Sequence, residues 1–128
     1  VCETHNPGQS RMTIVVVGDE HILEQIIKQL SKLVEVISVS HSLPSETTQR
    51  EMTLIKVKAS GTDRAVIIET CEIFRAHIVD VAQNSVIVES TGSEDKIKSL
   101  IRLLEPYGIL ELCKTGLCSM DRGEKILK

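Results

Sequence analysis

The side chains that could act as an acid–base pair lie in the second half of the sequence. Asp80 and Glu89 fall on two neighbouring predicted strands, where a pair of carboxylates could share one region of a sheet. His77 precedes Asp80 by three positions and could form a dyad with it. The residues around them alternate between polar and apolar, as on a half-solvated strand. We therefore interpret all three as surface residues of a sheet and expect no catalytic role.

The four cysteines could bind a metal, but none of them forms a C-x-x-C pair: Cys2, Cys71, Cys113 and Cys118. Cys113 and Cys118 stand five positions apart, which in one strand would place them on opposite faces. A zinc site built from these two thiols and His77 is an alternative that this spacing does not favour. We interpret the cysteines as free thiols in a reducing compartment.

Motifs that cradle phosphates, bind zinc or present a nucleophilic serine are absent from the sequence. It contains no G-x-x-x-x-G-K-[ST], G-x-G-x-x-G, H-E-x-x-H or G-x-S-x-G. His41 lies alone in a polar segment, where we expect a solvated loop residue, and Lys125 and Lys128 form no basic patch. With a net charge of −3, one Phe and one Tyr, the chain lacks the features that attract and stack nucleic acids.

Apolar runs in the sequence are short. They reach about four residues, which is too few for a bilayer span or for the core of a signal peptide. We expect a soluble cytoplasmic protein, or one of the plastid stroma if the source is a photosynthetic eukaryote.

The first third of the chain predicts a strand, a helix and a second strand. Residues 14–17 (IVVV) are a β-branched run that ends at Gly18, which is typical of a strand. Asp19 can cap the helix that follows. The apolar residues of this helix recur at helical spacing: Leu23, Ile26, Ile27, Leu30 and Leu33. A second strand is predicted at residues 34–39, ahead of Pro44.

The same pattern returns 74 positions later. Gly18 corresponds to Gly92 and Asp19 to Ser93, so the two helix caps coincide. The apolar positions also correspond: Leu23 with Ile97, Ile26 with Leu100, Ile27 with Ile101, Leu30 with Leu104 and Val36 with Leu110. A match of this length indicates an internal duplication.

Residues 51–60 predict a half-buried strand with a wet side. One face would carry Thr53, Ile55, Val57 and Ala59, and the other would carry Lys56 and Lys58. A helix capped by Thr62 or Asp63 follows, with an apolar face formed by Val66, Ile67, Thr70, Cys71 and Phe74.

The remaining elements complete a recognised order. Residues 76–81 predict a strand with Val79 and Val81 on the face of His77, and residues 86–89 predict the next one after a turn at 83–84. A helix over residues 94–104 and a strand from Ile109 follow. The order βαββαβ is the ferredoxin-like motif of an α+β fold. We expect two helices on one face of a four-stranded antiparallel sheet, with the other face open or paired with another copy.

The repeat also predicts the domain organisation. We expect an incomplete domain at residues 1–43, a linker at 44–50, a complete ferredoxin-like domain at 51–120 and a polar tail at 121–128. The offset of 74 places the opening strand and first helix of the first copy ahead of Val1. A sheet without that strand keeps an unpaired edge, so we expect a fragment or a subunit that a partner completes.

Several segments together resemble one known family. They are SRMTIVVVGDE, IIKQLSKLVEVISVS, REMTLIKVKA, EIFRAHIVDV, VESTGSEDKI and LLEPYGILELCKTG. In this order and spacing, over residues 10–123, the chain resembles the small regulatory subunit of acetolactate (acetohydroxyacid) synthase. The resemblance implies a partial ACT domain followed by a second ferredoxin-like domain, and two chains that pair through their ACT sheets.

The resemblance also implies a function in the biosynthesis of valine, leucine and isoleucine. A subunit of this kind is not itself catalytic. It binds and activates a catalytic subunit, which carries thiamine diphosphate, Mg²⁺ and FAD, and it makes that subunit sensitive to valine or another branched-chain amino acid. In this family the effector binds at the ACT–ACT interface, through positions that would lie before Val1. No effector-binding residue is therefore assigned in this sequence.

Two other classes of function are alternatives to a regulatory subunit. Another amino-acid-sensing ACT module, for example in a transcriptional regulator, would need a basic pair of DNA-binding helices. A small enzyme of the acylphosphatase type would need a phosphate-cradling loop with an arginine. The sequence contains neither feature, so it favours the regulatory subunit.

Overall fold

The structure, a computed structural model, describes residues 1–127. The chain divides into two compact units. Unit 1 comprises Val1–Thr48 together with the C-terminal segment from Ser119, and unit 2 comprises Gln49–Cys118. Within the described residues, no helix has the length and apolar character needed to cross a membrane.

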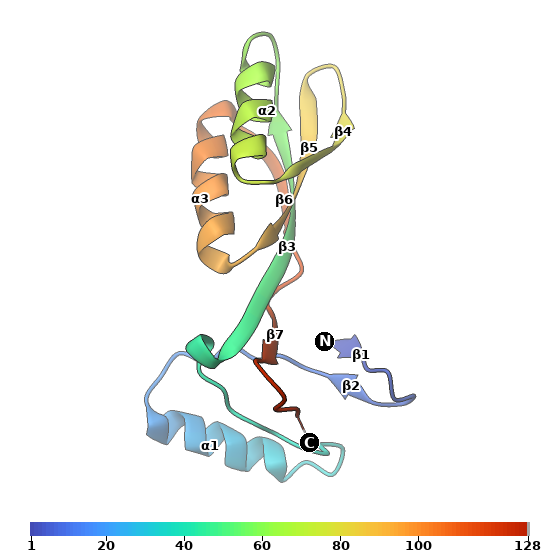
Figure 1. Ribbon diagram of the computed structural model, residues 1–128, viewed down its shortest axis with the longest axis vertical. Helices are drawn as coiled ribbons and strands as arrows, with labels where there is room; N and C mark the ends of the chain where they lie inside the picture. Colours follow the sequence, from blue (N-terminus) through green and yellow to red (C-terminus); the bar gives the residue numbers. More distant parts are fainter. Residues whose placement is uncertain (128) are drawn as a thin grey trace. The chain divides into compact units, whose positions relative to one another are not determined.

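Unit 2 has the predicted antiparallel sheet with two helices on one face (Figure 1). Its strands are β3 (Thr47–Lys58), β4 (His77–Val81), β5 (Ser85–Gly92) and β6 (Ile109–Lys114), in the spatial order β4–β5–β3–β6. Helix α2 (Asp63–Ile73) connects β3 to β4, and α3 (Glu94–Leu104), extended by the 3₁₀ turn η2 (Glu105–Tyr107), connects β5 to β6. The α+β class and the ferredoxin-like order are confirmed.

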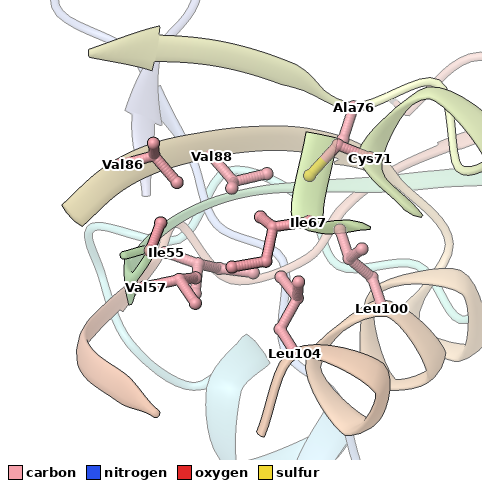
Figure 2. Close-up of a cluster of buried hydrophobic side chains, with 10 residues drawn as sticks. Ile55, Val57, Ile67, Cys71, Ala76, Val86, Val88, Leu100 and Leu104 are labelled. Atoms are coloured by element: carbon pink, nitrogen blue, oxygen red, sulfur yellow. The ribbon is translucent and has the colours of Figure 1, made fainter. Parts of the chain in front are cut away.

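The central strand β3 builds the core by strict alternation. Its fully buried residues are Thr53, Ile55 and Val57, and Ala59, directly after the strand, is also fully buried, as predicted. Val86 and Val88 of β5 lie opposite Val57 and Ile55. Side chains from both helices complete the cluster (Figure 2): Ile67, Cys71, Leu100 and Leu104. Because each buried Val, Leu or Ile contributes about 1.5–3 kcal/mol, this single layer accounts for most of the stability of unit 2.

Helix α3 matches its predicted range. The Ser93 hydroxyl accepts a hydrogen bond from the Lys96 amide at 3.3 Å and caps the helix. An ion pair of 2.9 Å joins Lys98 to Glu94, and the hydrogen bond from Lys98 lowers the pKa of the Glu94 carboxyl. Both side chains are exposed, so the pair adds little to stability. The burial of three residues holds the helix instead: Ile97, Leu100 and Leu104.

Helix α2 buries a narrower face than the sequence predicts. Ile67 and Cys71 are buried, but Val66 is 44% exposed. Thr62 precedes the helix without a side-chain cap bond. The predicted apolar face is therefore correct at its centre and wrong at Val66.

In unit 1, the predicted helix forms and the predicted strands do not. Helix α1 (Glu20–Ser31) starts 74 positions before α3, and the Asp19 carboxylate accepts a bond from the Ile22 amide at 2.9 Å. Residues 14–17 and 34–39 form no strand. Val17 and Val34 are 95% and 96% exposed, because no neighbouring strand in the described chain pairs with these segments. The strands that do form here are the two-residue pair β1 (Cys2–Glu3) and β2 (Ser10–Arg11).

Two predicted boundaries and one predicted strand face need correction. The expected linker, residues 44–50, contains the 3₁₀ turn η1 (Pro44–Glu46) and the start of β3 at Thr47. The expected tail begins within a strand, β7 (Cys118–Asp121), which pairs with β3; Lys128 lies outside the described residues. In β4 a register shift between Ile78 and Asp80 breaks the alternation, so Asp80 rather than Val79 shares a face with His77.

Arg64, near the start of α2, is hydrogen-bonded to two loops. Its guanidinium donates from Nη2 to the carbonyl oxygens of Ala59, Ala82 and Gln83, at 3.2, 2.6 and 2.7 Å. Ala59 follows β3, and the other two residues form the turn between β4 and β5. One side chain therefore fixes the hairpin turn against the start of α2.

Replacing Arg64 with Ala should lower the free energy of unfolding by about 1.5–3 kcal/mol, because charge-assisted hydrogen bonds to three carbonyl groups are lost. Urea denaturation followed by circular dichroism measures this change. Arg102→Ala is the matched control, since Arg102 lies exposed in the last turn of α3 and should change stability by less than about 0.5 kcal/mol. Equal effects of the two variants would contradict the proposed tie.

Candidate functional site on the open face of the sheet

The face of the sheet opposite α2 and α3 is uncovered in unit 2 (Figure 1). Two rows of residues cross the strands at its centre. The strand register gives one row of Asp80, Ile87, Lys56 and Glu111. The next row is His77, Glu89, Leu54 and Cys113. We call this surface the open face. It carries charges of both signs around apolar side chains at its centre.

Lys56 and Glu111 form the one ion pair recorded on the open face within the described residues. The Lys56 Nζ lies 3.7 Å from the Glu111 carboxylate, across neighbouring strands. The two side chains are 41% and 74% exposed, so solvent screens the pair and it contributes little to folding. Met52 and Leu54, on the same face of β3, are each 37% exposed. The face thus combines accessible charge with accessible apolar area.

The predicted acid–base candidates share the open face but do not converge. Asp80 lies opposite Ile87, and Glu89 lies opposite His77. The two carboxylates are therefore diagonal neighbours on adjacent strands, with backbones about 7–8 Å apart. In the described part of the chain, no hydrogen bond or ion pair joins them to each other or to His77. This is the arrangement of a solvated sheet surface.

Metal binding by His77, Cys113 and Cys118 does not fit the sheet order. His77 is on β4 and Cys113 is on β6, at opposite ends of the order β4–β5–β3–β6. Three strand spacings separate their backbones by roughly 14 Å. The zinc alternative is therefore wrong for this set. Across residues 1–127, no three His, Cys, Asp or Glu side chains are gathered to hold a metal ion.

Two hollows lie on unit 2, and both are small. One, of about 170 Å³, lies on the open face between Leu54, Lys56, Ile87, Glu111, Leu112 and Cys113. The other, of about 240 Å³, is lined by Arg50, Glu51, Met52, Thr91, Thr115 and Cys118. Small-molecule sites occupy about 300–1,000 Å³, so neither hollow has the size of such a site.

Sequence reasoning identified only part of this surface. It placed Lys56 and Lys58 on the face opposite the core, as the structure has them. It did not single out Leu54, Ile87 or Glu111. Strand alternation in the sequence could have indicated which face of its strand each of the three residues occupies. Whether the three lie next to one another depends on the register between strands, which the sequence does not display.

Two family models match the chain, one in each half. Residues 50–123 match the family described as the small subunit of acetolactate synthase, and residues 1–38 match the ACT domain of acetohydroxyacid synthase small-subunit-like proteins. The chain belongs to the acetolactate synthase small-subunit family.

Relatives of this family are similar over most of the chain. A probable acetolactate synthase small subunit of Archaeoglobus fulgidus is 49% identical over 122 residues, which cover 95% of this chain and 76% of the relative. The small subunit of Mycolicibacterium smegmatis is 45% identical, covering 95% and 72%. The crystal structure of the small subunit from Thermotoga maritima has 40% identity and a TM-score of 0.77, covering 85% of this chain and 68% of that chain.

The cysteines of this small-subunit family member differ in environment. Cys71 lies on the buried face of α2, and burial raises the pKa of its thiol to about 11. Cys2, Cys113 and Cys118 are exposed free thiols.

Iodoacetamide at pH 8 should alkylate Cys2, Cys113 and Cys118 in the folded protein and leave Cys71 unmodified, because only the thiolate reacts and the raised pKa keeps Cys71 protonated. Peptide mass spectrometry identifies the modified residues. In urea all four cysteines should react, which serves as the control. Equal rates for Cys71 and Cys113 in the folded protein would contradict the buried environment of Cys71.

Proposed function

We propose that this chain is a non-catalytic regulatory subunit that binds the catalytic subunit of acetolactate synthase and raises its activity. The observation that carries the proposal is the pair of family matches, one in each half of the chain. In this proposal, thiamine diphosphate, Mg²⁺ and FAD belong to the catalytic subunit. The chain acts in the compartment of that partner.

Feedback by valine or another branched-chain amino acid is the second part of the proposal. We assign this role to unit 1, because the ACT family model matches residues 1–38. Helix α1 of this unit has no fully buried residue. Four of its apolar side chains are half-buried: Leu23, Ile26, Ile27 and Leu30. An apolar stripe of this kind needs a covering surface, and we propose that a second copy contributes to it through pairing of the ACT sheets. The residues that bind the effector are not assigned.

The open face of unit 2 is proposed as a further contact between two copies. A two-fold interface brings the same patch together twice, so the patch must be complementary to itself. The open face meets this condition in charge, because Lys56 lies among Asp80, Glu89 and Glu111. Met52 and Leu54 supply apolar area near its centre.

Adding this chain to a purified acetolactate synthase catalytic subunit should raise acetolactate formation several-fold and saturably, and calorimetry should detect binding independently of activity. Activation that valine reverses would place the effector site within this chain. Activation that valine does not reverse would limit the chain to binding and activation. The absence of both binding and activation with a cognate catalytic subunit would contradict the proposed function.

Replacing Leu54 with Asp should weaken self-association about tenfold or more, since it places a charge in the apolar centre of the open face. Sedimentation velocity over a concentration series measures the dissociation constant. Leu103→Asp is the matched control, because Leu103 is 50% exposed on α3, in the helical layer. Unchanged self-association of the Leu54 variant would exclude the open face as the contact.

A further inference from the structure

The C-terminal segment at residues 119–122 follows unit 2 in the sequence but belongs to unit 1 in the structure. We call this segment the strap. The family model that matches residues 50–123 includes the strap with the second domain. The boundary between the two units in the structure therefore differs from the end of the segment that the family model matches. The chain passes between the units twice, after Thr48 and after Cys118.

Hydrogen bonds from early parts of the sequence hold the first residues of the strap. The Arg11 guanidinium donates from Nη2 to the Ser119 carbonyl oxygen at 2.9 Å, across 108 positions of sequence. The Ser42 hydroxyl donates to the Asp121 carboxylate, across 79 positions. Both bonds are partly buried, so water competes with them less than on an open surface.

Arg122 makes two hydrogen bonds to the segment that leads into β3. Its backbone amide donates to the Glu46 carbonyl oxygen at 3.0 Å, and its Nε donates to the Thr47 carbonyl oxygen at 3.1 Å. Thr47 is only 4% exposed. A buried carbonyl group requires a hydrogen-bond partner, and Arg122 supplies one. The far end of the chain thus satisfies the backbone at the point where β3 begins.

We propose that the strap is a clamp that orders residues 42–47, the segment that leads from unit 1 into β3. Unit 1 has little apolar core of its own, because α1 buries no residue completely. A few long-range hydrogen bonds therefore make up a larger share of its stability than they would in unit 2. As a consequence, these hydrogen bonds hold the start of β3 and the end of β7 together. A structural change in residues 42–47 then acts on both chain crossings between the units.

The test is amide hydrogen exchange by NMR on the full chain carrying Arg122→Ala. The amides of Glu46 and Thr47 should exchange about three- to tenfold faster, which corresponds to the loss of one hydrogen bond. The amides of Ile55 and Val88, in the core of unit 2, should keep their rates. Lys125→Ala is the matched control, because Lys125 is an exposed cation that lies just beyond the strap.

A second variant keeps the test decisive if exchange in unit 1 is too fast to resolve. Ser42→Ala should shift the amide resonance of Asp121, because it removes the hydroxyl that donates to the Asp121 carboxylate. The clamp is excluded if Arg122→Ala leaves Glu46 and Thr47 unchanged and Ser42→Ala leaves Asp121 unchanged. It is also excluded if Arg122→Ala accelerates Ile55 as much as Thr47, since that result indicates general destabilisation.

Discussion

The alternation of β3 is the constraint on which the structure of unit 2 depends. This strand is hydrogen-bonded to β5 on one side and to β6 on the other, so both of its faces are set by the same backbone. Ile55 and Val57 point to the helices, and Leu54 and Lys56 point to the open face. A shift of one residue would exchange the two sets and place lysines in the core. The apolar core therefore specifies the composition of the open face as well.

The two halves of the internal repeat show what a helix and a strand each require. Helices α1 and α3 begin at equivalent positions and have equivalent caps, from Asp19 and from Ser93. A cap bond spans three residues, so it forms without tertiary contacts. The strands beside α3 pair and bury their side chains, whereas residues 14–17 remain unpaired. A strand needs a second strand for its backbone bonds, and local sequence cannot supply one.

A subunit that acts by contact with other proteins fits these features. Unit 2 presents an open face that carries both charge signs, and its hollows are smaller than small-molecule sites. Unit 1 presents an amphipathic helix without a complete cover. The chain passes between the two units twice, and the strap is hydrogen-bonded to the residues where β3 begins. A protein that regulates another by assembling with it requires surfaces that bind partners. It also requires a connection between its units that is held in place.

Much of this protein was determined by its sequence, and the remainder by long-range pairing. Period-two alternation predicted the buried row of β3, and helical spacing with a capping serine predicted α3 and its buried face. These features depend on neighbours within a few residues, so the sequence displays them directly. The register that places Glu111 beside Lys56 joins residues 55 positions apart, and the strap bonds span up to 108. Residues 14–17, whose β-branched run predicts a strand, likewise form none and pair with no other segment of the described chain. Only the tertiary structure decides these points, because strand pairing depends on which segments meet and not on what each segment prefers alone.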